Sequence, residues 1–392
     1  MSETLPSATN LQQGARSRPC VCTVLIIGGG IAGLSAAVAL SRVGVQCNVV
    51  EIADSPLGAS LGISGRAAEA LAELGVYDQC YATSTPFDRN TTATYIHDTE
   101  GRVISTGPKR PEWPGARTAL GVYRPELLRI LEETAKSLGV VIERGVTAEA
   151  IEDRDETSLV TFTDGRQRSF DFVIGADGIG SRTRSMIFPD AVKPAYSGQI
   201  SIRWMVPGPE VAGEGWYFGP VGRLGFYHLP QDVIYVPAVI TMPEFKRMSQ
   251  EEVHALFAHL LDAFTAPAMV ELRSRLTPDA DLICRPFDWI LLRDKWHRGR
   301  TLLIGDAAHA TTAHMGMGGG MALEDAVVLA QCIAAAPTLA AAFDAFMTRR
   351  FERVRTVVET SVALSQLEQA NAPPSENVKL LTSAFSTIAE PY

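Results

Sequence analysis

The 392-residue sequence predicts an α/β fold in which a parallel-sheet domain is interleaved with an antiparallel-sheet domain and followed by C-terminal helices. Three observations support this prediction. Residues 21–51 read as an apolar strand, a glycine cluster, an Ala- and Leu-rich helix and a second apolar strand. Residues 195–245 form short alternating runs typical of antiparallel strands, with a helix expected over 251–264. The segment 339–370 has helical periodicity with an arginine-rich face, on which we expect surface salt bridges.

Composition narrows the function classes. Hydrophobic residues make up 46% of the chain and charged residues 20%, which suits a large core and two domains. The 44 acidic residues outnumber the 35 basic ones, so no basic surface for nucleic acid is expected. Apolar runs such as 21–27 are too short to span a membrane. The six cysteines form no CxxC pair, which predicts packing roles, no metal site and a cytoplasmic location.

The first unit carries a nucleotide-binding pattern. Gly28, Gly30 and Gly33 occupy GxGxxG positions, where glycine serves a tight turn, a close approach to a pyrophosphate and close packing of helix on strand. Glu51 ends the second strand, where a carboxylate can accept hydrogen bonds from a ribose. A glycine-rich turn is the alternative, but the strand, the helix and the acid together favour a Rossmann-like dinucleotide site. This unit alone does not choose between NAD and FAD.

Two further motifs follow strands. Residues 171–184 read DFVIGADGIGSRTR, with Asp177 and Gly178 after an apolar run and a helix expected next. Residues 300–309 read RTLLIGDAAH and place Asp306 after another strand. A glycine-rich segment containing Gly316, Gly318 and Gly319 then precedes a helix expected to begin near residue 321.

In this order, GGGIAG, IGADGIGSRTR and LLIGDAAHA…MGMGGGMALEDA closely resemble the class A FAD monooxygenases, the flavoprotein aromatic hydroxylases typified by p-hydroxybenzoate hydroxylase, salicylate hydroxylase and 6-hydroxynicotinate 3-monooxygenase. The resemblance covers about residues 21–335. It implies an FAD-binding domain, reduction by NADH or NADPH, and O2-dependent hydroxylation of an aromatic or N-heteroaromatic substrate through a flavin C4a-hydroperoxide.

The resemblance also implies roles for single residues. Asp306 is expected to bind the ribityl chain, Asp177 and Gly178 to lie near the pyrophosphate, and Arg124 to contact the flavin cofactor. Backbone N–H groups of residues 316–320 are expected to point toward the flavin ring, where they favour negative charge. The alternatives are a capped turn at Asp306, an Asp-Gly turn at Asp177 and a surface salt bridge at Arg124.

The sequence departs from the family at several positions. Ala313 stands where a proline is usual in the loop before the flavin, and Gly320 where asparagine or another residue is found. An arginine often present shortly after the acid of the first unit is missing. Gly62 aligns with the histidine proposed as base in 6-hydroxynicotinate 3-monooxygenase, so that base cannot be carried over.

Other residues are therefore candidates for the substrate site. His228, on a strand whose alternation puts it on one face with Leu224 and Phe226, is a candidate base, and so is His314 in the flavin loop. Arg203 is expected to hold a carboxylate or oxyanion, and Tyr217 to hydrogen-bond a phenol. Structural roles in sheet, loop or packing remain the alternatives for all four. His309 is expected to buttress the turn at Asp306.

These assignments define a domain plan. We expect a flexible tail at 1–20, an FAD-binding domain at 21–80, 112–190 and 290–336, a substrate domain at 81–111 and 191–289, and C-terminal helices at 337–392. The expected partners are a small aromatic substrate and O2, with either a monomer or a homodimer. Alternatives of function are oxygenation of a larger natural product or antibiotic, and a non-catalytic flavin-binding protein. A flavin-dependent halogenase is not expected, because the five tryptophans form no WxWxIP pattern.

Overall fold

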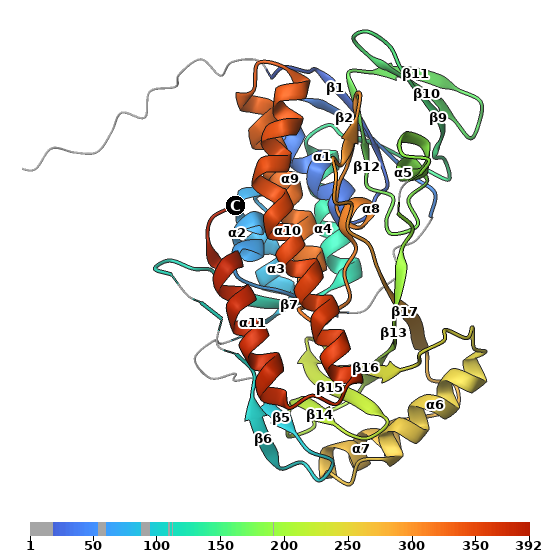
Figure 1. The fold of residues 1–392 in the computed structure, drawn as a ribbon, viewed down its shortest axis with the longest axis vertical. Helices are drawn as coiled ribbons and strands as arrows, with labels where there is room; N and C mark the ends of the chain where they lie inside the picture. Colours follow the sequence, from blue (N-terminus) through green and yellow to red (C-terminus); the bar gives the residue numbers. More distant parts are fainter. Residues whose placement is uncertain (1–18, 54–59, 88–94, 109, 112, 191) are drawn as a thin grey trace, which may run out of the picture.

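The computed structural model describes residues 19–53, 60–87, 95–108, 110–111, 113–190 and 192–392. Two layered domains lie one above the other, with long helices along one side (Figure 1). The tail predicted at 1–20 falls almost entirely outside the described residues.

The first domain is built on a six-stranded sheet whose central strands are parallel. These strands are short and apolar, as is typical of a sheet covered on both faces. Only the β18–β19 pair of this sheet is antiparallel. The strand order is β18 (His297–Arg298), β19 (Thr301–Leu303), β12 (Phe172–Gly175), β1 (Thr23–Ile27), β2 (Gln46–Glu51) and β8 (Val141–Arg144).

Alternate residues of β1 face two different layers. Val24 and Ile26 belong to the large core formed with helices, whereas Leu25 and Ile27 belong to a smaller core formed with a second sheet. The helices of the first layer are α1 (Ile31–Arg42), α4 (Arg124–Ser137) and α9 (Gly318–Ala335). The second layer is the antiparallel sheet of β9 (Ala148–Asp153), β10 (Ser158–Phe162) and β11 (Gln167–Phe170). The predicted strand–helix–strand unit, β1–α1–β2, is confirmed.

Helix α9 is the one helix in the described ranges that is long and apolar enough to cross a membrane. It has 18 residues with a mean hydropathy of 1.2, and 72% of them are buried inside the protein. It packs against α1, and it carries two adjacent buried acidic residues, Glu324 and Asp325. Helix α9 is therefore a core helix of the first domain.

The second domain is a seven-stranded sheet, which is antiparallel as predicted except at the β14–β5 pair. Its lower face in Figure 1 is covered by helices α6 (Gln250–Asp262) and α7 (Pro267–Arg275). A capping box between Ser249 and Glu252 begins α6. The strand order is β17 (Leu282–Trp289), β13 (Ala195–Pro207), β16 (Val233–Thr241), β15 (Gly222–Leu229), β14 (Gly215–Phe218), β5 (Tyr95–His97) and β6 (Val103–Thr106).

Shorter elements connect the domains. The segment predicted as substrate domain at 81–111 divides, because β5 and β6 join the seven-stranded sheet while β4 pairs with β7. The sheet order here is β3 (Ser60–Ile63), β7 (Ala119–Tyr123) and β4 (Thr85–Phe87). The short helices are α2 (Arg66–Glu73), α3 (Tyr77–Thr83), α5 (Arg182–Ile187) and α8 (Asp306–His309).

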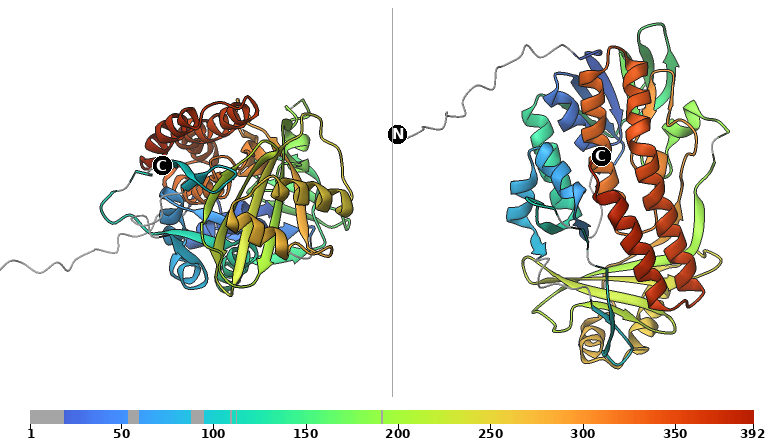
Figure 2. Two further views of the ribbon diagram at one scale, coloured as in Figure 1. Left: turned by 90° about the horizontal axis from the view of Figure 1, so that it is seen from below. Right: turned by 60° about the vertical axis from the view of Figure 1, so that its left-hand side comes forward.

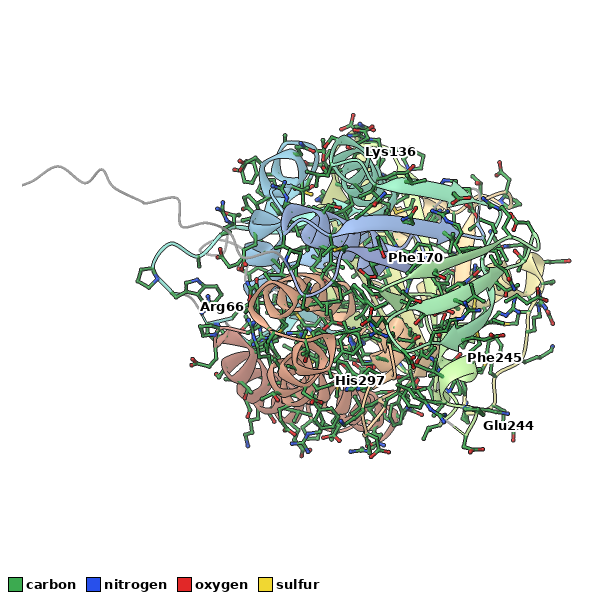
Figure 3. All side chains as sticks on the ribbon, turned by 90° about the horizontal axis from the view of Figure 1, so that it is seen from above. Arg66, Lys136, Phe170, Glu244, Phe245 and His297 are labelled. Carbon is green, nitrogen blue, oxygen red and sulfur yellow. The ribbon has the colours of Figure 1, made fainter. Side chains whose placement is uncertain are left out.

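The chain ends in two long helices that lie side by side, α10 (Leu339–Gln369) and α11 (Pro374–Ala389) (Figure 2). With 31 residues, α10 is about 45 Å long and reaches from the parallel-sheet domain to the antiparallel sheet. Arg66, the first residue of α2, donates a hydrogen bond to the carbonyl of Ala389, the last residue of α11, at 2.7 Å. Figure 3 shows this arginine beside the C-terminal helices.

The prediction that the arginines of α10 make surface salt bridges is wrong for two of them. Arg350 and Arg353 are buried and pair with Glu324, and Arg350 also pairs with Asp325. The reason is that these arginines face α9, whose two interior acids need positive partners. Arg355 does form an exposed pair, with Glu352.

The prediction that the cysteines pack inside also holds only in part. Cys47, Cys80 and Cys332 are buried, and Cys20 and Cys284 are half-buried. Cys22 is exposed. All six are free thiols.

Candidate active site

The three sequence motifs meet at one edge of the parallel sheet. Gly28 follows β1, Glu51 ends β2, Asp177 follows β12 and Asp306 follows β19. All four strands are parallel to one another, so their carboxyl ends lie at the same edge. Ligands of open α/β sheets bind at this edge.

The glycines of the first motif have different tasks. A Cβ on Gly28, which has φ +112°, would lie 2.3 Å from the carbonyl oxygen of Ala176, and one on Gly33 would lie 1.8 Å from the oxygen of Gly28. Both positions are closed to any side chain. A Cβ on Gly30 would meet no atom within 4 Å, and this residue precedes α1 without a side-chain cap. The N–H groups at the start of α1 therefore face open space, which suits a pyrophosphate.

Glu51 is held in place by the backbone. One carboxylate oxygen accepts the N–H of Gly29 at 2.7 Å and the other accepts the N–H of Ala53 at 2.8 Å. Each oxygen keeps a second lone pair that can accept a ribose hydroxyl. The predicted role of Glu51 is compatible with this arrangement.

Asp177 serves the local turn. Its carboxylate accepts hydrogen bonds from the hydroxyl of Ser181 and from the N–H and hydroxyl of Thr183, while Ser181 caps helix α5. These contacts match the Asp-Gly turn considered from the sequence. The adjoining Gly178 has φ +76°, and a Cβ there would meet no atom within 4 Å, so its backbone is open to a ligand.

Asp306 interacts electrostatically with Arg124. Its side chain is accessible, yet the surrounding protein is close enough that burial raises its pKa, against the effects of His309 and Arg124. Burial lowers the pKa of Arg124, while Asp306 raises it and Arg203 lowers it. The structure thus brings together an acid after β19, an arginine at the start of α4 and an arginine of the antiparallel sheet.

Asp325, which the sequence motif contained but to which no role was given, supports the Asp306 turn. One of its oxygens accepts the N–H of Gly305 at 2.9 Å and lies 2.7 Å from Nε2 of His309. The expected buttressing role of His309, whose side chain is buried, agrees with this geometry. The adjacent acids Glu324 and Asp325 in an otherwise mostly apolar helix were the signal that could have identified this support.

Residues 311–317, which precede α9, are called the flavin loop here. Gly316 has φ +64° and is exposed, and α9 begins at Gly318, three residues before the predicted start. No side chain caps the helix, so the N–H groups of Gly318 and Gly319 remain free of a cap. A Cβ on Gly320 would lie 2.8 Å from Cβ of Ala67. Close packing against α2 therefore explains why this chain departs from the family at Gly320.

His314 is enclosed within the flavin loop. Its side chain is 1% exposed, Nδ1 lies 2.9 Å from the hydroxyl of Thr312, and Nε2 lies 3.2 Å from a carboxylate oxygen of Glu368. Burial lowers the pKa of His314, with Glu368 acting in the opposite direction. Both ring nitrogens are thus engaged by protein groups.

Tyr217 and His228 lie on the opposite face of the sheet from the one expected. Tyr217 is buried in the core with α6 and α7 and donates its hydroxyl to Gly213. Nδ1 of His228 lies 2.7 Å from a carboxylate oxygen of Glu214, and Nε2 accepts the N–H of Val211 at 3.0 Å. The alternation that groups His228 with Phe226 is confirmed, but α6 and α7 cover that face.

Arg203 occupies the face of the sheet that is turned toward the first domain. It pairs across strands with Pro237, so it shares a face with Tyr235, two residues away. Burial raises the pKa of Tyr235 and Arg203 lowers it. Within the described part of the chain, no carboxylate lies within ion-pair distance of Arg203. Tyr235 had not been identified from the sequence, because it lies in an ordinary β-like run.

The residues present fit FAD. The glycine turn and the start of α1 suit the pyrophosphate, Glu51 a ribose, Asp306 and Arg124 the middle of the cofactor, and the N–H groups at the start of α9 a flavin ring with negative charge. The fold and this site define a flavin-dependent oxidoreductase.

Comparisons with known proteins also indicate a flavin-dependent enzyme. The family model described as "FAD binding domain" matches residues 21–216 and 235–361, and the chain belongs to this family. It is 32% identical over 360 residues, 90% of this chain and 91% of the other, to 2-heptyl-3-hydroxy-4(1H)-quinolone synthase of Pseudomonas aeruginosa. It is 31% identical over 356 residues, 88% of this chain and 90% of the other, to aurachin C monooxygenase/isomerase of Stigmatella aurantiaca.

A solved structure shows the same fold. The crystal structure of Klebsiella pneumoniae HpxO with FAD and uric acid has a TM-score of 0.80 and 24% identity, and the match covers 94% of this chain and 96% of that one. The protein is an FAD-dependent monooxygenase of the class that acts on aromatic and heteroaromatic compounds with NAD(P)H as reductant.

Proposed function

We propose that the protein hydroxylates the ring of an N-heteroaromatic substrate with an acidic N–H or O–H group, such as a 4(1H)-quinolone, and that Arg203 binds this substrate as its anion. The single observation that carries the proposal is the half-buried guanidinium of Arg203, which faces the first domain with no carboxylate at ion-pair distance among the described residues. A guanidinium in this position favours a planar oxyanion. The quinolone in the name of the Pseudomonas aeruginosa relative supports the choice of ring.

The anion matters because of the reaction. Reduced FAD and O2 together supply an electrophilic oxygen, and a deprotonated ring attacks such an oxygen more readily than a neutral one. Arg203 stabilises the anion and so lowers the pKa of the bound substrate. Tyr235, whose own pKa is raised by burial, stays protonated and can donate its hydroxyl to an oxygen of the same substrate.

This assignment removes the need for a histidine base. His228 lies on the helix-covered face, and both ring nitrogens of His228 and of His314 already have protein partners. Activation of the substrate then falls to the positive charge of Arg203.

A second candidate, oxygenation of a substrate with a larger apolar substituent, is supported by an open surface cleft beside the flavin loop. Met317 of the flavin loop lines this cleft, and Phe385 and Ile388 of α11 line it from the other side. The heptyl group in the name of the Pseudomonas aeruginosa relative is a substituent of this type. Such a group would lie against Phe385 and Ile388 of α11.

The test compares 4(1H)-quinolone with 2-heptyl-4(1H)-quinolone. Oxidation of NADH and of NADPH is followed for each compound, and the products are identified by mass. Hydroxylation of either compound supports the ring proposal, and a preference for the heptyl compound supports the second candidate. If neither compound gives a product that is heavier by one oxygen atom, the proposed ring is wrong.

The role of Arg203 is tested by Arg203→Gln. We expect kcat/KM for hydroxylation to fall about 10- to 100-fold at neutral pH, and the defect to shrink at high pH, where the substrate ionises without help. His228→Gln should leave the pH profile unchanged. A pH-independent defect in Arg203→Gln, or a shifted profile in His228→Gln, would contradict the assignment.

A further inference from the structure

Glu368, near the end of α10, joins three parts of the molecule. One carboxylate oxygen lies 2.8 Å from Nε of Arg223 on β15, and the other lies 3.2 Å from Nε2 of His314 in the flavin loop. The amide of Gln199 on β13 donates to Glu368 over 3.4 Å. The side chains of Glu368, Arg223 and His314 are 12%, 10% and 1% exposed, so the group is almost closed to water.

Arg223 links Glu368 to the face of the sheet that also carries Arg203. Arg223 pairs with Val239 and Arg203 with Pro237, two residues apart on β16, so both side chains point to the same side. The guanidinium of Arg223 lies 4.1 Å from the ring centre of Trp216, which is half-buried on that face. A ligand that contacts Trp216 would therefore act, through this ring, on Arg223, the ion-pair partner of Glu368.

His314 links Glu368 to the flavin loop. Burial alone would raise the pKa of Glu368, but Arg223 and His314 lower it to about 2, so the carboxylate is ionised. An ionised carboxylate accepts the Nε2–H of His314, and Nδ1 can then accept the hydroxyl of Thr312. The ring is also enclosed by Phe287, at 5.5 Å between centres. The orientation of His314, two residues before Gly316, is thus set by α10.

We propose that Glu368 is a positioning residue that holds the flavin loop against the seven-stranded sheet and so fixes the N–H groups at the start of α9 toward the flavin. The proposal rests on FAD binding and does not depend on the substrate proposed above. Reduced FAD carries more negative charge than oxidised FAD, so N–H groups held toward the ring favour the reduced form. A displaced loop weakens that preference. A purely structural ion pair would change the stability of the protein without changing this preference.

The first measurement needs no substrate. The midpoint potential of protein-bound FAD is determined by equilibration with a reference dye in the wild type, Glu368→Gln and Glu359→Gln. Glu359 is the matched control, since it lies on the same helix in exposed pairs with Arg293 and Arg355. We expect Glu368→Gln to bind FAD. Its preference for reduced over oxidised FAD should be about tenfold weaker than that of the wild type. The control should stay within twofold of the wild type.

A second measurement reports the hydrogen-bonding state of His314 in the flavin loop directly. With ¹⁵N-labelled histidine, NMR should show His314 as the Nε2–H form in the wild type and a mixture of tautomers in Glu368→Gln. His314→Gln keeps a neutral donor for Glu368, so its FAD potential should remain close to that of the wild type, whereas His314→Phe should behave like Glu368→Gln.

Because Glu368→Gln leaves the buried charge of Arg223 without its partner, the double variant Arg223→Met/Glu368→Gln is included. It removes both charges and should fold, yet it should still show the altered potential and the tautomer mixture. An unchanged potential and an unchanged His314 tautomer in the double variant would overturn the proposal. An equal change in Glu359→Gln would overturn it as well.

Discussion

Arg350 of α10 and Asp325 of α9 form an ion pair with no exposure to solvent, with 2.7 Å between Nε and the carboxylate oxygen. The second oxygen of Asp325 accepts the N–H of Gly305, the residue directly before Asp306. The carboxylate of Asp325 therefore connects α10 to the turn that carries Asp306, the acid expected to bind the ribityl chain.

This relationship predicts a large effect of Asp325→Asn. The change leaves Arg350 and Arg353 to share the single charge of Glu324, so one buried positive charge is uncompensated, at a cost of about 3–5 kcal/mol in the free energy of unfolding. We also expect weaker FAD binding, because the turn at Gly305 loses its support. Urea unfolding and FAD titration measure the two effects. Glu352→Gln, which breaks the exposed pair with Arg355, should change stability by less than about 1 kcal/mol; comparable losses in both variants would contradict the prediction.

The glycines of the first motif should respond differently to the same change. Gly33→Ala forces a Cβ against the oxygen of Gly28, so the strand–helix unit should be strongly destabilised or fail to fold. Gly30→Ala adds a Cβ in open space, so the apoprotein should melt near the wild-type temperature while FAD affinity falls. Thermal unfolding of the apoproteins and FAD titration distinguish the two. A Gly30→Ala protein with full FAD affinity would remove the pyrophosphate from this turn.

The two motif acids should also differ. Asp306→Ala should lower FAD occupancy markedly, because its carboxylate is accessible and interacts with Arg124. Asp177→Ala removes hydrogen bonds to Ser181 and Thr183 and should cost about 1 kcal/mol of stability, with a smaller effect on FAD. The flavin-to-protein absorbance ratio after purification gives the occupancy. Full occupancy in Asp306→Ala would exclude that residue from the cofactor site.

Glu368 should make stability depend on pH in the acid range. Its pKa is about 2 in the folded protein against an ordinary value of 4.5, so its contribution is fully present above pH 4.5 and is lost as the pH falls through about 2. The contribution amounts to at most roughly 3 kcal/mol. The difference in unfolding free energy between the wild type and Glu368→Gln should therefore shrink from pH 5 to pH 3. A difference that stays constant over this range would show that the charge of Glu368 contributes nothing.

The sequence was sufficient for features that depend on local spacing. Gly28 and Gly33 could be assigned their tasks because turn, strand and helix lie within one short segment, and the alternation of β15 grouped His228 with Phe226. The alternation does not say which face of the sheet is turned toward the first domain. That depends on which face α6 and α7 cover. The partners of Arg350 and Glu368 were also not predictable, since they lie more than 20 residues away along the chain.

Helix α10 bears on how this enzyme can be recombined with its relatives. Arg350, in the first half of the helix, is buried against α9, and Glu368, at its C-terminal end, is buried against the flavin loop and the seven-stranded sheet. A chimera that exchanges only the antiparallel sheet would break the second group, and one that exchanges only the C-terminal helices would break both. The natural unit of exchange is therefore discontinuous: an imported sheet should bring its own counterparts of Glu368 and His314, or retain Arg223.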